Sequence, residues 1–135
     1  MKILSFNVNG VRACAGKTLL QDLNTLDCDV VCLQETKATP EQVAEALSGL
    51  TGYHLYAYSA EKKGYSGTAI LSKELPLSVK MGLGIGEHDN EGRVITAEFQ
   101  DYFVVTAYVP NASSGLKRLD YRTKGWDVAF LAFLK

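Results

Sequence analysis

An unbroken apolar run at positions 30–33, Val-Val-Cys-Leu, constrains the fold of this chain more than any other segment. Asp29 precedes the run, and the polar residues Gln34 and Glu35 follow it. A short segment without polar alternation is typical of a strand that is buried on both faces. The chain is therefore expected to fold into layers, with other elements covering both faces of the sheet that contains this strand.

The segments around this strand predict the order β-α-β-α followed by several strands. Apolar alternation and turn residues predict further strands at residues 3–8, 53–58, 68–72, 77–81, 93–99 and 102–109. The spacing of apolar residues predicts helices at about residues 17–26, 40–48 and 116–135, the second of which begins with the capping box Thr39-Pro40-Glu41-Gln42. Residues 82–86 read as a flexible connector. The order as a whole predicts a mixed sheet with helices packed on it.

The composition is that of one globular domain, with 135 residues of which 47% are hydrophobic and 21% are charged. The net charge of −1 gives no basic excess, so any nucleic-acid surface has to be local. No apolar run is long enough to span a membrane, and the N-terminus becomes polar too early for a signal peptide. Cys14, Cys28 and Cys32 form no CxxC pair, and Cys28 and Cys32 flank and occupy an apolar run, which predicts buried thiols and not a disulfide or a zinc site. We therefore expect no membrane partner and a reducing compartment, the cytoplasm or, in a eukaryote, the nucleus.

Polar residues gather where the predicted strands end. The four clusters are Asn7 with Asn9, and residues 34–37, 64–67 and 108–111. Strand ends are where α/β sheets usually place their sites. Glu35 ends the buried strand, and a lone carboxylate there needs a cation, either Lys37 or a metal ion. One carboxylate with an amide oxygen suits Mg²⁺, which keeps several waters and also binds phosphate oxygens.

Each of these residues also has an ordinary structural explanation. An ion pair between Glu35 and Lys37 is, by itself, commoner than a metal ligand. Asn7 and Asn9 are typical turn residues. Tyr108 suits a core tyrosine whose hydroxyl reaches the rim, and a lone arginine such as Arg93 suits a surface ion pair. His54 and His88 have no nucleophile beside them in the sequence, so neither is given a catalytic role.

The joint pattern of five segments resembles one family of enzymes. The segments are Lys-Ile-Leu-Ser-Phe-Asn-Val-Asn-Gly-Val-Arg (2–12), Asp-Val-Val-Cys-Leu-Gln-Glu-Thr-Lys (29–37), Gly-Tyr-Ser-Gly (64–67), Glu-Gly-Arg-Val-Ile (91–95) and Thr-Ala-Tyr-Val-Pro-Asn-Ala (106–112). In order and in spacing they resemble segments of the exonuclease III family of apurinic/apyrimidinic endonucleases. Residues 118–122 resemble this family as well, so the resemblance covers essentially the whole chain.

The resemblance implies a fold class, which is half of a four-layer α/β sandwich of the DNase I-like type, with a mixed, mostly antiparallel sheet and flanking helices. Residues 1–135 are expected to form the N-terminal part of an endonuclease/exonuclease/phosphatase domain, truncated at its C-terminus. The implied reaction is hydrolysis of the DNA phosphodiester 5′ to an abasic site, as in base excision repair, with Mg²⁺ or Mn²⁺ as the cofactor. The implied partner is double-stranded DNA with abasic sites, and 3′–5′ exonuclease activity is a further expectation for the full-length parent.

The resemblance also assigns roles to matching positions of this sequence. Glu35 matches the metal-binding glutamate, and Asn7 matches the asparagine beside that metal. Tyr108 matches the active-site tyrosine that contacts the scissile phosphate, so Tyr108 and Asn7 are the expected catalytic residues. The expected DNA-binding residues are Asn9, Lys37, Tyr65, Arg93 and Asn111. Asn9 stands where close relatives often carry an aspartate, which leaves this site one negative charge lower.

Three departures from the family pattern limit these expectations. The family's Gly-Asp-x-Asn and Ser-Asp-His segments, which activate the attacking water and bind the phosphate, are absent, so we expect the isolated chain to be inactive or nearly so. Ser114 stands where a close relative carries an arginine that enters DNA, which predicts weaker DNA contact. Gly125 is one extra residue and is expected to rotate the end of the last helix by about 100°.

Two other functions remain open at the level of sequence. The chain could be an inactive fragment that binds DNA weakly or that associates with itself through an incompletely covered sheet. The missing C-terminal half and a second copy are then the two partners that could complete the sheet. The chain could also act on phosphoinositides or other phosphoesters, although residues 34–37 and 108–112 favour DNA.

Overall fold

Strand β2, Val30–Gln34, lies in the middle of the molecule, as the apolar run predicts. Its first four residues are buried. Val31 and Leu33 pack against helices on one side, whereas Val30 and Cys32 pack against a second sheet on the other. The alternate side chains of one strand therefore belong to two different hydrophobic cores, which explains why the strand carries no polar alternation.

The computed structural model describes the backbone of residues 1–135 and every side chain except that of Ser114, so the expectation for Ser114 lies outside the described side chains. The first sheet has the strand order β1-β2-β4-β3, in which the other strands are β1 (Ile3–Asn7), β3 (His54–Tyr58) and β4 (Thr68–Ser72). Strand β1 runs parallel to β2, and β4 runs antiparallel to both of its neighbours.

A second, antiparallel sheet packs against the first. Its strands are β5 (Ser78–Met81), β6 (Val94–Glu98) and β7 (Phe103–Ala107), in that order. The expected hairpin turn joins β6 to β7, where the Phe99 amide donates to the Tyr102 carbonyl over 2.9 Å. The predicted strands are thus confirmed, but they divide into two sheets because β5 starts a new sheet instead of extending the first.

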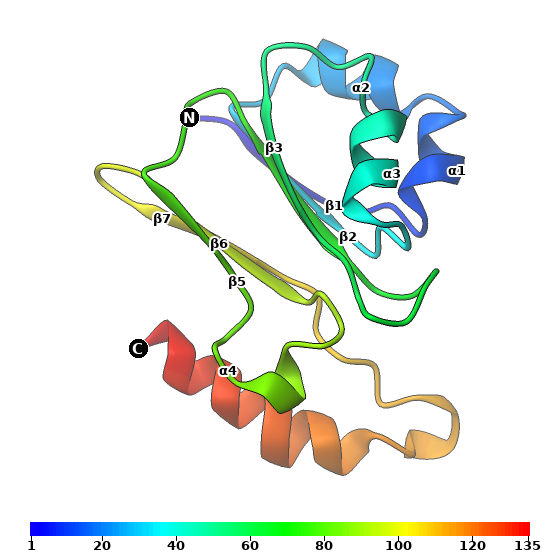
Figure 1. The fold of residues 1–135 in the computed structure, drawn as a ribbon, viewed down its shortest axis with the longest axis vertical. Coiled ribbons are helices and arrows are strands. Elements are labelled where there is room, and N and C mark those ends of the chain that lie inside the picture. Colours follow the sequence, from blue (N-terminus) through cyan, green and yellow to red (C-terminus); the bar gives the residue numbers. More distant parts are fainter.

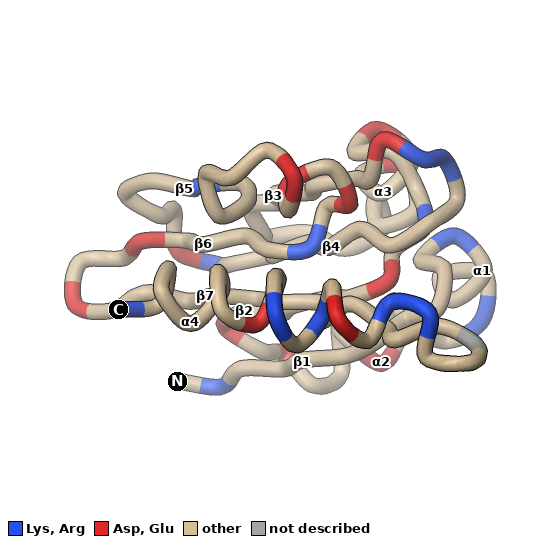
Figure 2. Tube along the Cα trace, turned by 90° about the horizontal axis from the view of Figure 1, so that it is seen from below, with Lys and Arg blue, Asp and Glu red and all other residues tan. Residues whose placement is uncertain are grey.

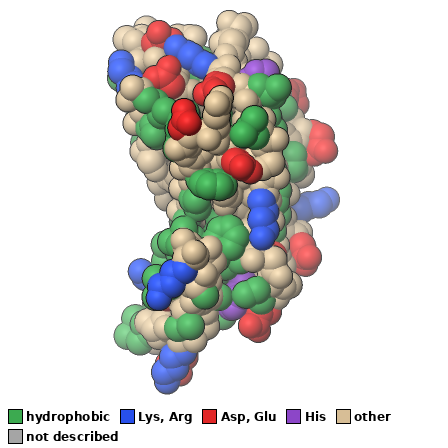
Figure 3. Space-filling model, turned by 90° about the vertical axis from the view of Figure 1, so that its left-hand side faces the viewer, with side chains coloured by type: hydrophobic (Ala, Val, Ile, Leu, Met, Phe, Trp, Pro, Cys, Tyr) green, Lys and Arg blue, Asp and Glu red, His purple; other side chains and the backbone are tan. Residues whose placement is uncertain are grey.

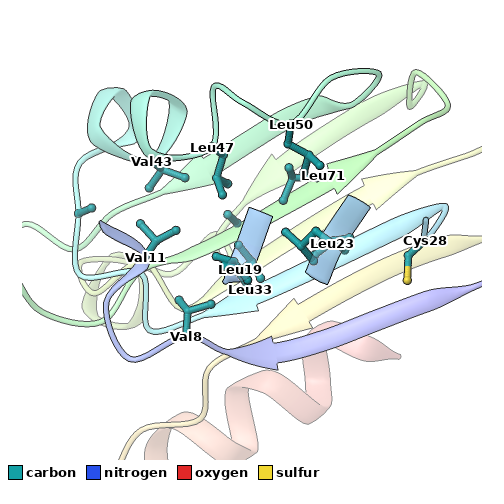
Figure 4. Packing of buried hydrophobic residues seen from close by; sticks show 13 residues of the cluster. Val8, Val11, Leu19, Leu23, Cys28, Leu33, Val43, Leu47, Leu50 and Leu71 are labelled. Atoms are coloured by element: carbon teal, nitrogen blue, oxygen red, sulfur yellow. The ribbon is translucent and has the colours of Figure 1, made fainter. Parts of the chain in front are cut away.

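Three short helices cover the outer face of the first sheet: α1 (Val11–Ala15), α2 (Leu19–Leu26) and α3 (Pro40–Ala46). Figure 4 shows their apolar side chains, such as Leu23 and Val43, pointing toward Leu33 and Leu71 of the sheet. The capping box at Thr39 is formed as predicted, with both of its hydrogen bonds present. Helix α1 is an element that the sequence did not predict, because its only buried residue is Val11 and one apolar contact makes no periodic pattern.

The layers run helix, sheet, sheet, helix through the molecule (Figure 1). Helix α4, Asp127–Leu134, covers the outer face of the second sheet through Ala129, Phe130 and Phe133. The expected fold class, half of a four-layer α/β sandwich with a mixed, mostly antiparallel sheet and flanking helices, is confirmed.

Gly125, interpreted from the sequence as an extra residue, lies in a π-helical segment, Tyr121–Trp126, which leads into α4. A π-helix places one more residue in a turn than an α-helix, so such a segment can absorb an inserted residue locally. Trp126 is fully buried after it, and its ring centroid lies 4.9 Å from that of Phe130. The expected 100° rotation of the helix end stays a prediction, because it is defined relative to a chain without the extra residue.

The connector at residues 82–86 is held in place, which corrects the expectation of flexibility. The Asp89 carboxylate accepts hydrogen bonds from the backbone amides of Leu83, Gly84 and Ile85 over 2.7–2.9 Å. A short 3₁₀ helix, Gly86–His88, follows the connector and buries His88. One acidic side chain thus supplies the backbone of this loop with the hydrogen bonds that a sheet or helix would give.

The edges formed by β1 and β7 lie on the same side of the two sheets, as Figure 2 shows. Ile3 on β1 is 53% exposed and Phe103 on β7 is 66% exposed, which is unusual for large apolar side chains. Figure 3 shows hydrophobic side chains open to solvent on the side of the molecule where both chain ends lie. Val128, Leu131 and Leu134 of α4 are also exposed, so this helix is apolar on both faces.

Two expectations about the chain's environment can be compared with the structure. The three cysteines are free thiols, with Cys28 and Cys32 buried, and burial raises the pKa of Cys32 to about 11. Within the described residues, none of the helices combines the length and the apolar character that crossing a bilayer requires.

Gly92 is a position at which the fold leaves no room for a side chain. Its φ is +62°, and a Cβ there would lie 2.6 Å from the Ser59 carbonyl carbon. We expect Gly92→Ala to lower the free energy of unfolding by about 2–4 kcal/mol, from left-handed strain together with a backbone clash, as measured by urea denaturation. Gly52 also has a positive φ but nothing within 4 Å of its Cβ position, so Gly52→Ala is the control and should cost only about 1–2 kcal/mol. Equal losses for both variants would contradict the importance of this close approach.

Candidate active site

The candidate site begins where the parallel strands β1 and β2 end together. Asn7 pairs with Gln34 at the last position of the ladder. The next two backbone hydrogen bonds run from the Val8 amide to the Gln34 carbonyl and from the Gly10 amide to the Glu35 carbonyl, over 3.0 and 2.8 Å. The polar residues after the two strands are therefore held side by side, as carboxyl ends of parallel strands usually are.

Glu35 lies in a tight loop with an unusual backbone. Glu35 and Lys37 both have positive φ, 61° and 53°, on either side of the buried Thr36. The Thr36 and Lys37 amides donate to the Gly67 and Ser66 carbonyls, which fixes the loop against residues 64–67. Non-glycine residues in the left-handed region cluster at functional sites, where the surrounding structure holds them.

Lys37 provides a positive charge next to the Glu35 carboxylate. Its Nζ lies 3.5 Å from Glu35 Oε1 and donates to Asn9 Oδ1 over 2.8 Å. The Glu35 side chain is only 21% exposed. The ion pair considered from the sequence is thus present, and it places a cation between a carboxylate oxygen and an amide oxygen.

Tyr108 follows β7, whose end lies against the end of β2, since Gln34 Nε2 donates to Thr106 Oγ1 over 3.0 Å. Burial raises the pKa of the Tyr108 phenol first, and the nearby negative charge of Glu35 raises that pKa further. The phenol therefore stays protonated at neutral pH and can donate a hydrogen bond. The structure brings Glu35 and Tyr108 together from the two sheets, which the sequence could suggest only through the family resemblance.

Asn7 and Asn9 form a turn beside Glu35. The Asn7 Oδ1 accepts from the Asn9 amide over 3.0 Å, and Asn9 has a φ of 47°. Both residues are exposed, so the turn that they shape lies open to a ligand beside Glu35. Asn111 is exposed in the loop after β7, three residues beyond Tyr108.

Arg93 does not lie on the rim, which corrects its expected place as an exposed DNA contact. It is 2% exposed and forms a buried ion pair with Glu91, with Nη2 3.5 Å from the carboxylate. Its guanidinium donates to the Tyr108 carbonyl and to the Tyr65 hydroxyl, both over 3.0 Å. The guanidinium also lies 5.0 Å from the centre of the Tyr108 ring. Arg93 thus connects Tyr65 with Tyr108 inside the protein.

Glu91 and Arg118 are two site residues that received no role from the sequence. They line an open cavity of about 550 Å³ together with Tyr65, which is half-buried. Arg118 donates to both oxygens of Glu91, over 3.0 and 3.4 Å, and to the Tyr65 hydroxyl over 3.2 Å. Both residues lie in segments that carry the family resemblance, 91–95 and 118–122, so position in a motif was the available signal.

The residues present fit part of a Mg²⁺ site. Among the described residues, no group of three or more His, Cys, Asp or Glu side chains could hold a metal ion. Mg²⁺ usually takes one or two carboxylates and keeps several waters, so Glu35 with an asparagine amide oxygen is a sufficient protein contribution. The Lys37 ammonium, which contacts oxygens of both Glu35 and Asn9, shows that this group of oxygens accepts a cation.

Comparison with known proteins places these features in a family. A sequence profile described as Endonuclease/Exonuclease/phosphatase family matches residues 4–135. The chain belongs to this endonuclease/exonuclease/phosphatase family. Within the family it is 55% identical over 136 residues to the "DNA repair nuclease APEX1" of Danio rerio and 50% identical over 135 residues to an "Exodeoxyribonuclease" of Bacillus subtilis. Each alignment covers 99% of this chain but only 44% and 52% of those relatives, so the chain spans about half of their length.

Solved structures of this family have the same fold. An AP endonuclease from Leishmania major superimposes with a TM-score of 0.83 at 30% identity, covering 98% of this chain and 47% of that one. An AP endonuclease from Archaeoglobus fulgidus gives a TM-score of 0.81 at 30% identity, covering 99% of this chain and 51% of that one. The recognition of the exonuclease III family from the five sequence segments is confirmed.

The Glu91 ion pairs are expected to make stability depend on pH. Burial would raise the pKa of Glu91, but hydrogen bonds from Arg118 and Tyr65 and the charges of two arginines outweigh it and lower the pKa below 4.5. Because the pKa of Glu91 is lower in the folded than in the unfolded protein, its negative charge stabilises the fold above about pH 4.5. This contribution is lost as the pH falls through the folded-state pKa. We expect Glu91→Gln to cost about 2–3 kcal/mol at pH 7, as measured by urea denaturation, and progressively less below pH 4.5.

The matched control is Glu45→Gln, because Glu45 is an exposed glutamate. This variant should unfold like the parent at every pH. A Glu91→Gln cost that stays constant down to pH 3 would show that the carboxylate charge is not the stabilising feature.

Proposed function

We propose that this chain is the part of a DNA repair nuclease that binds the scissile phosphodiester, in a reaction that hydrolyses the DNA backbone 5′ to an abasic site. The observation that carries the proposal is the hydrogen bond between Gln34 at the end of β2 and Thr106 near the end of β7, which brings the next residues, Glu35 and Tyr108, to one site from two different sheets. The names of its relatives, a DNA repair nuclease, an exodeoxyribonuclease and a "DNA-(apurinic or apyrimidinic site) endonuclease", support the substrate class.

Each residue of the site has a different part in stabilising negative charge on the phosphate. Glu35, with Asn7 beside it, is the residue that would hold Mg²⁺, and the ion supplies neutralisation of the charge that develops on phosphate oxygens. The protonated phenol of Tyr108 donates to a non-bridging oxygen, and the Asn111 amide is a second donor. Because Asn9 is neutral, the site carries less negative charge than it would with an aspartate there, which favours an anionic substrate.

The surface around the site contacts the DNA backbone. Lys37 and the exposed part of Arg118 neutralise phosphates, a type of contact that gives affinity without reading sequence. Tyr65 and Asn9 are further DNA contacts in this proposal, whereas Arg93 acts from inside the protein. An abasic nucleotide has no base to unstack, so moving it into the site costs little free energy. A DNA substrate is consistent with a location in the cytoplasm or, in a eukaryote, the nucleus.

The catalytic unit of this proposal is larger than residues 1–135. The chain spans about half of its relatives, and the residues that would activate the attacking water are assigned to the other half. Residues 1–135 thus act as the N-terminal part of an endonuclease/exonuclease/phosphatase domain, inactive or nearly so when isolated. Exonuclease activity is part of the same proposal, because the B. subtilis relative is named an exodeoxyribonuclease, and the family resemblance implies that it acts at 3′ ends.

A chimaera tests this function directly. Residues 1–135 would replace the matched segment of the B. subtilis exodeoxyribonuclease, to which they are 50% identical. We expect the chimaera to nick a duplex that carries one tetrahydrofuran site, and EDTA to stop the reaction. Glu35→Gln should lower the rate by at least about 100-fold, because removing a single group that stabilises transition-state charge typically costs that much.

Two controls accompany the chimaera. Residues 1–135 alone should give no EDTA-sensitive nicking, and Glu45→Gln in the chimaera should leave the rate unchanged because Glu45 is exposed on α3. A folded chimaera that degrades intact single strands but ignores the abasic duplex would contradict the endonuclease proposal and leave only the exonuclease part.

The free edges of β1 and β7 favour a second candidate, a non-enzymatic module that associates with itself. Exposed Ile3 and Phe103 lie on these edge strands, and unpaired strand edges are templates for pairing with another chain. If a second copy covers this side, light scattering should report a dimer, and Phe103→Lys should return it to a monomer. Leu116→Lys, at a similarly exposed apolar residue in the 3₁₀ turn Ser114–Leu116, outside both sheets, is the control. A monomer for the parent chain at 100 μM would exclude self-association through these edges.

A further inference from the structure

We propose that Glu91 is a positioning residue, whose carboxylate holds the guanidinium groups of Arg93 and Arg118 around the Tyr65 hydroxyl and so fixes the Tyr65 ring as a rigid wall of the DNA-facing cavity. The part of this inference that concerns DNA rests on the proposed function. The part that concerns Tyr65 does not, because it can be measured on the protein alone.

Three loops that are far apart in the sequence meet at this carboxylate. Glu91 Oε1 accepts from Arg118 Nη2 over 3.0 Å, and its Oε2 lies 3.5 Å from Arg93 Nη2. The Tyr65 hydroxyl accepts from Arg93 over 3.0 Å and from Arg118 over 3.2 Å. The two arginines therefore join the Glu91 carboxylate and the Tyr65 phenol in a closed network, in which each guanidinium contacts both groups.

Burial makes the anion necessary. Arg93 is 2% exposed, and its Nε has no hydrogen-bond partner among the described residues. A buried guanidinium without a counter-charge is strongly unfavourable, so Glu91, itself only 15% exposed, keeps Arg93 in place. Because Arg93 also donates to the Tyr108 carbonyl, the same carboxylate links the Tyr65 wall to the site tyrosine.

The backbone places Glu91 and Arg93 around a glycine that has no room for a side chain. Gly92 approaches the backbone of Tyr58 and Ser59, and its carbonyl accepts from Thr68 Oγ1 over 3.0 Å. The residues on either side of Gly92 therefore have little freedom to move. The Arg118 guanidinium also lies 4.5 Å from the centre of the Tyr121 ring, and this contact orients the guanidinium.

The charges around the Tyr65 phenol affect its pKa, which can be followed by ultraviolet absorption. Burial raises the pKa of Tyr65, and Glu91 raises it further, whereas Arg93 and Arg118 lower it. Lys62 lies over the same ring, 5.2 Å from its centre, and the Tyr108 ring lies on the far side of Arg93. Removing the Glu91 charge leaves the arginines without an opposing charge, so the pKa of Tyr65 should fall.

The decisive experiment is an ultraviolet titration of the Tyr65 phenol in residues 1–135. Each protein is compared with the same protein carrying Tyr65→Phe, which isolates the signal of one tyrosine among the seven. We expect Glu91→Gln to shift the Tyr65 titration to lower pH and Glu91→Asp to restore most of the parent value. A Tyr65 titration that is identical in the parent and in Glu91→Gln would overturn the proposal.

A second variant keeps the test informative if Glu91→Gln unfolds. Arg118→Gln removes a charge that lowers the pKa of Tyr65 and leaves the buried Arg93–Glu91 pair intact, so the Tyr65 titration should move to higher pH. The near-ultraviolet signal of the buried Trp126 reports whether each variant is folded. A folded Arg118→Gln protein without this upward shift would also overturn the network.

Binding to DNA tests the consequence for the ligand. Fluorescence anisotropy would compare a duplex carrying one tetrahydrofuran site with an intact duplex, over a range of salt concentrations. We expect Glu91→Gln to lower the preference for the abasic duplex about tenfold, which is the size of one aromatic stacking contact. We also expect its affinity for DNA to depend more steeply on salt, by about one phosphate contact, because the released Arg118 can then bind a phosphate. Glu91→Asp should retain the parent behaviour.

The Tyr65 titration and the DNA-binding measurement together distinguish a failure of the positioning role from a failure of the proposed function. If the parent chain shows no preference for the abasic duplex while the Tyr65 titration responds to Glu91, the positioning role stands and the proposed function fails. If the parent prefers the abasic duplex and Glu91→Gln keeps that preference, Glu91 has no role in DNA recognition and this part of the inference fails.

Discussion

Burial of β2 on both faces is the constraint on which the rest of this structure depends. Because its alternate residues enter two cores, the helices and the second sheet must both pack against one strand. That stacking brings the end of β2 next to the end of β7, although the two strands belong to different sheets. Glu35 and Tyr108, which follow these strands, belong to one site for this reason, so the apolar run and the polar residues after it are two parts of one arrangement.

The ion pairs around the site lie in loops at the ends of strands. Lys37 compensates Glu35 on one side of the site, and Glu91 compensates Arg93 and Arg118 on the other. Each pair is partly or fully removed from water, where an unpaired charge is costly, so the loops are held by electrostatics as much as by apolar contacts. The overall charge of −1 gives no hint of this, because the paired charges nearly cancel in the sum.

The sequence predicted the elements that carry a repeated local signal. Alternation located the strands, and the Thr39 capping box located the start of α3. Helix α1, with one buried residue, carried no such repeat. The burial of Arg93 was missed for a different reason: its partners are Tyr65 and Tyr108, which are distant in the chain, and only the stacking of two sheets brings them together. Glu35 was identified because its position after a buried strand is a local feature, whereas the importance of Glu91 and Arg118 depends entirely on tertiary contacts.

The π-helical segment at Tyr121–Trp126 has a wider consequence for how such a chain can change in length. A residue gained inside a helix can be absorbed in a single wider coil, so the residues after it can still face the core, as Trp126 and its neighbour Phe130 do here. Homologues can therefore differ by one position in this region while their tertiary packing stays superimposable. An alignment that instead spreads the offset to the chain end would pair the wrong residues of α4 throughout.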